Sequence, residues 1–207
     1  MSNIREQRCA SVTELRIAEP TTENGLPSIE GHAALFDSLS QDLGGVFPFK
    51  EKIRAGAFKA SIGKDDIRAL WNHDPNYVLG RNKAGTLDLE ETDKGLKVRI
   101  QPPDTQWARD LTESIKRGDV TQMSFGFICE KDSWASEEGQ DIRTLERVRL
   151  FDVSPVTFPA YLDTDVGVRS AMDSYKAHKD NQTKQAAETA KRKAEFERLH
   201  AKFKKEE

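Results

Sequence analysis

Cysteine is scarce in this chain, which has only Cys9 and Cys129 among its 207 residues. Two cysteines cannot form a disulfide framework or a cysteine-based metal cluster, and their scarcity favours a reducing cytosol over an oxidising compartment. No apolar run approaches the ~18 residues that a membrane span requires. The N-terminal segment also lacks the apolar stretch of a signal peptide. We therefore expect a cytosolic protein with no membrane partner.

An excess of basic residues is also missing. The formal net charge is -3 and the pI is about 5.9. A nucleic-acid-binding protein normally carries a basic surface patch, so we expect no nucleic-acid partner. Hydrophobic residues make up 36% of the chain and charged residues 32%. This polar composition still supports one hydrophobic core, and the length suits one domain with extensions.

Glycine and proline are absent from residues 173–207, whereas the rest of the chain holds all 13 glycines and all 8 prolines. The same segment has ten Lys or Arg and seven Asp or Glu residues. Its Ala, Lys, Glu, Gln and Arg residues predict a helix, with an i,i+4 pair between Glu188 and Arg192. Phe196, Leu199 and Phe203 would form a narrow apolar stripe. The helix could be a solvated extension or a docking helix.

The remaining sequence predicts strands around a smaller number of helices. Residues 86–100 alternate apolar and polar side chains around a Gly-containing turn, which predicts a hairpin. Residues 107–119 have helical spacing and a terminal Gly118. Strand-like segments occur at 31–37, 67–71, 120–130 and 147–158. We predict an α+β fold with an antiparallel core and peripheral helices, divided into an N-terminal lead (1–28), a domain (29–172) and the tail (173–207).

Ser124 stands out within the strand-like segment. Alternation places Met123, Phe125 and Phe127 on a face that should be buried, and Ser124 and Gly126 on the opposite, open face. Glycine at such a place often marks the close approach of a ligand or another backbone. The alternative is an ordinary serine on a solvated sheet face. Cys129 continues the apolar face, where it should act as a small buried hydrophobe.

His73 follows the strand-like segment 67–71 and precedes Asp74-Pro75, which signals a turn. It could cap that turn or transfer a proton. The other histidines are less promising: His32 fits a structural role, and two more lie in the tail.

Asp152 is predicted to share a strand face with Val148 and Leu150. A carboxylate on an apolar face needs a partner. A histidine partner would give the orientation that a Ser-His pair needs, whereas Arg143 or Arg147 would make a structural ion pair. The chain order of His73, Ser124 and Asp152 differs from those of trypsin-like, subtilisin-like and α/β-hydrolase enzymes, and no G-x-S-x-G elbow is present.

An ordered set of motifs in residues 31–161 resembles the prohead proteases of tailed bacteriophages. These capsid-maturation serine proteases are related in fold to herpesvirus assemblin. The combination is specific, although each motif alone would be weak. The matching segments are "GHAALFD", "EKIRAGAF", "LWNHDPNYVLGR", "TLDLEETDKGLKV", "SIKRGDVTQMSFGF" and "VRLFDVSPVTFPAY".

The resemblance implies a barrel-like, assemblin-type core and a role for each candidate. The His of "NHD" is the general base, His73, and the Ser of "MSFGF" is the nucleophile, Ser124. The acidic residue before "VSP" is the third member, Asp152, with Glu146 as the alternative. Oxyanion donors are expected around Pro155–Ala160. The resemblance suggests no metal and no cofactor.

The resemblance also implies partners and a location. Major capsid protein and scaffold would be substrates inside the assembling procapsid in the host bacterial cytoplasm, and self-association and self-cleavage are expected. A basic amphipathic tail would suit a packaging signal or a self-cleavage target. The alternative is a catalytically inactive, scaffold-like assembly protein, although all three catalytic positions hold competent residue types.

Overall fold

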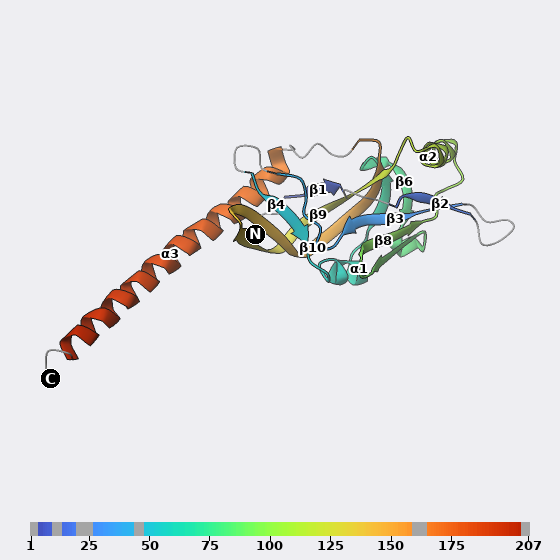
Figure 1. The fold of residues 1–207 in the computed structure, drawn as a ribbon. Coiled ribbons are helices and arrows are strands. Elements are labelled where there is room, and N and C mark those ends of the chain that lie inside the picture. Colours follow the sequence, from blue (N-terminus) through green and yellow to red (C-terminus); the bar gives the residue numbers. More distant parts are fainter. Residues whose placement is uncertain (1–3, 10–13, 20–26, 44–47, 159–164, 204–207) are drawn as a thin grey trace. The chain divides into compact units, whose positions relative to one another are not determined.

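The computed structural model describes residues 4–9, 14–19, 27–43, 48–158 and 165–203. The chain divides into two compact units, residues 1–170 and 171–207. Figure 1 shows the first unit as strands with short helices at their periphery.

The larger sheet of the first unit carries the candidate residues. Its strand order is β1-β9-β10-β5-β6, and β4 also pairs with β10. Most neighbours are antiparallel, but β10 pairs in parallel with both β4 and β5. The strands are β1 (Glu6–Cys9), β4 (Lys50–Ile53), β5 (Arg68–Trp71), β6 (Asp74–Arg81), β9 (Gln122–Glu137) and β10 (Gln140–Val156).

The smaller sheet is fully antiparallel in the order β2-β3-β8-β7. It confirms the predicted hairpin, whose strands pair from Leu87↔Ile100 to Glu91↔Leu96. Gly95 is required at the start of β8, because a Cβ there would lie 2.0 Å from the Ala34 carbonyl oxygen. The strands are β2 (Arg16–Ala18), β3 (Ser28–Leu35), β7 (Leu87–Glu91) and β8 (Gly95–Ile100).

Both sheets contribute to one hydrophobic core. Met123, Phe125 and Phe127 of β9 are buried there, which confirms the predicted apolar face. The remaining elements are α1 (Lys59–Lys64), the 3-10 helix η1 (Asn82–Ala84) and α2 (Gln106–Arg117). Helix α2 confirms the prediction for 107–119, and it ends where Gly118 adopts a left-handed conformation (φ 83°).

The hairpin of β9 and β10 is much longer than the sequence predicts. The two strands stay paired out to Glu137↔Gln140, where Glu138 and Gly139 (φ 50° and 82°) form a tight turn. Residues 131–146 lack a clean apolar alternation, because this arm buries charged groups. Arg143, Glu6 and Glu51 form a buried ionic cluster in which the Arg143 Nη1 atom lies 3.0 Å from each glutamate.

The described strands follow two open sheets rather than a closed ring of paired strands. The α+β class with a mainly antiparallel core is therefore observed, whereas the expected barrel-like closure is not. Residues 6–9 and 16–18, expected only to lead into the domain, form β1 and β2.

Helix α3 spans Asp165–Phe203 and so begins before the predicted start near residue 173. Its predicted ion pair is present, with Arg192 Nη2 2.9 Å from Glu188 Oε1. Phe196 is exposed, and the side chains of Leu199 and Phe203 lie outside the described residues. Among the described residues, no helix has the length and apolar character to cross a membrane.

Candidate active site

Ser124 lies near the start of β9, an interior strand of the larger sheet. Its neighbours in the ladder are Cys9 of β1 and Ser154 of β10. The prediction that its face is open is wrong, because Ser124 is completely buried. The Ser124 hydroxyl contacts His73 on one side and donates to the carbonyl oxygen of Arg8, 3.0 Å away in β1, on the other.

His73 occupies the tight turn between β5 and β6. Asn72 and His73 both have left-handed backbone conformations (φ 54° and 59°), and Trp71 pairs with Asp74 across them. The predicted turn at Asp74-Pro75 is therefore misplaced, because these two residues begin β6. Left-handed conformations cost about 1 kcal/mol or more for non-glycine residues and are frequent at functional sites.

Asn72 ties this turn to the end of β10. Its N–H donates to the Pro155 carbonyl at 3.0 Å, and its side-chain Oδ1 accepts from the Thr157 N–H at 2.9 Å. The His73 ring is thus carried by a turn anchored to the strand that holds Asp152.

The three predicted residues meet in a hydrogen-bonded row. His73 Nε2 lies 2.7 Å from Ser124 Oγ, and His73 Nδ1 contacts Asp152 Oδ2. A carboxylate at Nδ1 favours the tautomer with the proton on that nitrogen, so Nε2 presents its lone pair to the hydroxyl. This geometry suits proton transfer from Ser124 to His73.

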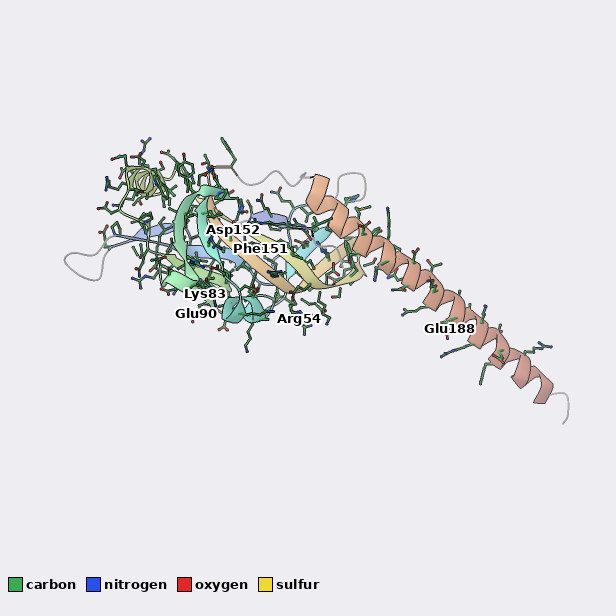
Figure 2. All side chains as sticks on the ribbon, turned by 180° about the vertical axis from the view of Figure 1, so that it is seen from behind. Arg54, Lys83, Glu90, Phe151, Asp152 and Glu188 are labelled. Carbon is green, nitrogen blue, oxygen red and sulfur yellow. The ribbon has the colours of Figure 1, made fainter. Side chains whose placement is uncertain are left out.

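A β-bulge brings Asp152 to this face of the sheet. Leu150 pairs with Phe127, but Asp152 pairs with Gly126, so Phe151 is an extra residue in β10. The bulge reverses the alternation, and the prediction that Asp152 shares a face with Leu150 is wrong. Leu150 packs in the core, whereas Asp152 faces His73. Figure 2 labels Phe151 and Asp152 next to each other on β10.

Gly126 provides the space that the Asp152 carboxylate fills. A Cβ built on Gly126 would lie 2.4 Å from Asp152 Oδ1 and 3.2 Å from Arg5 Nε and Nη2. Gly126 is closely approached, but by the side chains of Asp152 and Arg5 and not by the ligand or backbone that the sequence suggested.

Asp152 has two further partners that the sequence analysis missed. Ser154 Oγ donates to Oδ2 at 2.9 Å, and the Arg5 guanidinium donates to Oδ1. Burial raises the pKa of Asp152, but the hydrogen bond and charge of His73, the charge of Arg5 and the Ser154 hydroxyl together hold this pKa below its ordinary value. The i,i+2 spacing of Ser154 from Asp152 was a usable signal. Arg5, in a segment without periodicity, offered none.

The alternatives to Asp152 have other partners. Glu146 contacts Lys131 at 2.5 Å and Arg54 at 3.9 Å, and the hydrogen bond from Lys131 is the main reason that its pKa is lowered. Of the arginines considered for Asp152, Arg143 lies in the buried ionic cluster and Arg147 pairs with Glu130. Asp152 therefore contacts both a histidine and a third arginine.

The remaining candidates lie away from this row. Burial lowers the pKa of His32 and raises the pKa of Cys129 to about 12. Cys129 packs against the core on the predicted face, but it is only partly buried. No group of three or more His, Cys, Asp or Glu side chains in the described ranges is arranged to hold a metal ion.

The segment expected to supply oxyanion donors is only partly described, because residues 159–160 lie outside the described ranges. Pro155 has no N–H, and the Thr157 N–H already donates to Asn72. These contacts argue against Pro155 and Thr157 as oxyanion donors.

Comparison with known proteins places this chain in a family. Residues 13–180 match the family model described as Caudovirus prohead serine protease. The chain is 28% identical over 155 residues to the prohead protease of Enterobacteria phage HK97, covering 73% of this chain and 64% of that protein. It is 24% identical over 165 residues to the prohead protease of Escherichia phage T5, covering 78% and 71%.

The match therefore spans less than two thirds of the HK97 protein. A solved structure, the bacteriophage T4 capsid assembly protease, aligns with a TM-score of 0.46 and 15% identity over 74% of this chain and 99% of that one. Because the family model covers most of the sequence, the chain belongs to the Caudovirus prohead serine protease family.

Proposed function

We propose that this chain is a serine endopeptidase that matures a phage procapsid by cutting segments of scaffold or major capsid protein. The observation that carries the proposal is the hydrogen-bonded row of Ser124, His73 and Asp152. Family membership supports the same reaction. Ser124 is the nucleophile, His73 the general base, and Asp152 the group that orients His73.

The reaction follows from the contacts of His73 with Ser124 and Asp152. His73 Nε2 takes the hydroxyl proton as Ser124 Oγ attacks the peptide carbonyl carbon, and the Asp152 carboxylate stabilises the resulting imidazolium. His73 then gives this proton to the departing amine, which leaves an acyl-enzyme. A water molecule, deprotonated by His73, hydrolyses the ester and restores Ser124. Each backbone N–H donor to the oxyanion contributes about 3 kcal/mol.

Substrate access requires a local movement. Ser124 is fully buried, and its hydroxyl donates to the Arg8 carbonyl as well as lying beside His73. A substrate carbonyl therefore has to displace groups that cover Ser124, and the hydroxyl proton has to turn from Arg8 to His73 Nε2.

We further propose that the core is of the assemblin type. The support is that Ser124 lies within strand β9 and not at a strand–helix elbow.

The proposed site of action is the assembling procapsid in the host bacterial cytoplasm, with scaffold and major capsid protein as substrates. We propose that the protease domain (29–172) also includes strands β1 and β2 of the N-terminal segment (1–28), and that the tail (173–207) is a packaging signal or self-cleavage target. Deletion of residues 173–207 should reduce the protease incorporated into procapsids, measured by quantitative mass spectrometry. Unchanged incorporation would contradict a packaging role.

The test of activity is co-expression of this chain with the proposed major capsid and scaffold substrates. Wild type should yield shortened products in an intact-mass measurement, and Ser124→Ala should yield full-length chains. Identical intact products would favour the inactive, scaffold-like alternative.

The third member is tested by Asp152→Asn against Glu146→Gln in the same assay. We expect the larger loss of cleavage for Asp152→Asn, because Asp152 contacts His73 whereas Glu146 pairs with Lys131 and Arg54. A larger loss for Glu146→Gln would overturn the assignment.

A further inference from the structure

We propose that Arg5 is a positioning residue for the reaction, holding the Asp152 carboxylate in the orientation that His73 needs. This inference rests on the proposed protease function. It assigns a role to the N-terminal segment, which the sequence analysis treated only as a lead into the domain.

The two oxygens of Asp152 have separate partners. Oδ2 contacts His73 Nδ1 and accepts a hydrogen bond from the Ser154 hydroxyl, whereas Oδ1 accepts a hydrogen bond from the Arg5 guanidinium. Asp152 is only 1% exposed, so solvent cannot replace a missing donor at Oδ1 without rearrangement. A buried carboxylate that loses a donor tends to rotate toward another partner or take up a proton. Either change would weaken the hold on His73.

The Arg5 side chain also contacts Phe151, the residue next to Asp152. Its guanidinium carbon lies 5.1 Å from the centre of the Phe151 ring, and Phe151 is the extra residue of the bulge that turns Asp152 toward the site. The bulge thus places the Asp152 carboxylate at the site and the Phe151 ring against the Arg5 guanidinium. Gly126 leaves room for both groups, since a Cβ there would crowd Asp152 and Arg5.

The backbone that carries Arg5 is also anchored. The next residue, Glu6, is buried and contacts Arg143 at 3.0 Å and Arg8 at 2.8 Å. Glu6 also begins the pairing of β1 with β9, opposite Phe127. Strand β1 therefore fixes the position from which Arg5 reaches Asp152.

A purely structural ion pair is the competing explanation, because the Arg5 side chain is 48% exposed. Half-exposed pairs contribute little to folding stability. A positioning role makes a different prediction, because a cation beside Asp152 disfavours protonation of the carboxylate. The groups that face Asp152 are Arg5, His73 and Ser154. Without the Arg5 charge, Asp152 should take up a proton at a higher pH, so activity should be lost earlier as the pH is lowered.

The experiment compares full-length wild type with Arg5→Gln, Arg5→Lys and Arg149→Gln. Arg149 is the matched control. Its guanidinium carbon also lies 5.2 Å from the centre of the Phe151 ring, but Arg149 is an exposed residue of β10. The measurement is kcat and KM against pH, with the proposed major capsid protein as substrate. Thermal unfolding of each variant checks that the fold is retained.

We expect Arg5→Gln to lower kcat about tenfold, with little change in KM, and to move the acidic limb of the pH profile to higher pH. Arg5→Lys should keep the acidic limb near its wild-type position, and Arg149→Gln should resemble wild type. The inference is overturned if Arg5→Gln has a wild-type acidic limb, or if Arg149→Gln moves it equally.

A second readout separates this inference from the proposed function. In the Ser124→Ala background, the carboxyl titration of Asp152 can be followed by 13C NMR, with Asp152→Asn identifying the signal. Removing Arg5 should raise the pKa of Asp152 even where no substrate is cut. If Ser124→Ala cleaves like wild type, the proposed function is wrong. If cleavage requires Ser124 but neither the acidic limb nor this titration responds to Arg5→Gln, only the positioning role is wrong.

Discussion

Replacement of Gly126 by alanine tests whether the position of the Asp152 carboxylate controls the reaction. The added Cβ would lie 2.4 Å from Asp152 Oδ1, whereas ordinary contact begins near 3.4 Å. The carboxylate would therefore have to move by about 1 Å, and displacements of that size at a reacting group can lower the rate about 100-fold. The backbone of Gly126 is not left-handed, so alanine adds a steric change without backbone strain.

The assay is kcat/KM for the proposed cleavage of the capsid protein, together with the free energy of unfolding from chemical denaturation. We expect kcat/KM to fall about 100-fold, while crowding lowers the unfolding free energy by about 1–3 kcal/mol. Gly63→Ala is the matched control, because Gly63 lies in helix α1 and a Cβ there meets no atom within 4 Å. That variant should keep full activity and gain about 0.5–1 kcal/mol in stability. A folded Gly126→Ala enzyme with wild-type kcat/KM would refute the reasoning.

Three further predictions concern the charges and the thiol around the core. Arg143→Met should lower the unfolding free energy by about 3–5 kcal/mol, because it removes one of the two guanidinium groups, Arg143 and Arg8, that pair with the buried Glu6 and Glu51 carboxylates. Arg16→Met removes an exposed side chain and should change the unfolding free energy by less than about 1 kcal/mol. Equal losses in the two variants would contradict this. The hydrogen bond from Arg81 lowers the pKa of Asp66 to about 2. The stabilisation from this ion pair should therefore be present above pH 3.8 and be lost as the pH falls from 3.8 to about 2. In Arg81→Gln, the midpoint of the Asp66 carboxyl titration followed by NMR should rise toward 3.8, and an unmoved midpoint would refute the assignment. Burial raises the pKa of Cys129 to about 12. Iodoacetamide at pH 8 should therefore modify Cys129 far more slowly in the folded chain than in urea, as measured by peptide mass. Equal rates of modification would show that the thiol is accessible.

The sequence predicted the elements with clear periodicity. The hairpin of β7 and β8 and helix α2 follow their apolar patterns, and the buried face of β9 follows from Met123, Phe125 and Phe127. The long arm of β9 and β10 was missed, because its interior holds an ionic cluster around Arg143 rather than alternating apolar side chains.

The candidate site was predictable only as a set of residues. Periodicity placed Asp152 on the wrong face, because one extra residue at Phe151 reverses the alternation and a bulge has no periodic signature. His73 was placed beside a turn and not within it, since Asn72 and His73 are less common than Asn-Gly in such turns. The contacts of Ser124 with Arg8 and of Asp152 with Arg5 depend on the pairing of β1 with β9, which joins segments far apart in sequence.

The central claim, that His73 activates Ser124 as a nucleophile, is tested most directly by covalent labelling. The wild-type protein is treated with a fluorophosphonate, which reacts with activated serines, and the modified peptide is identified by mass. We predict a single adduct on the peptide at Ser124, slow to form because Ser124 is buried, and lost in His73→Ala. An adduct on Ser154 instead, or labelling of Ser124 that proceeds equally well without the His73 imidazole, would contradict the account.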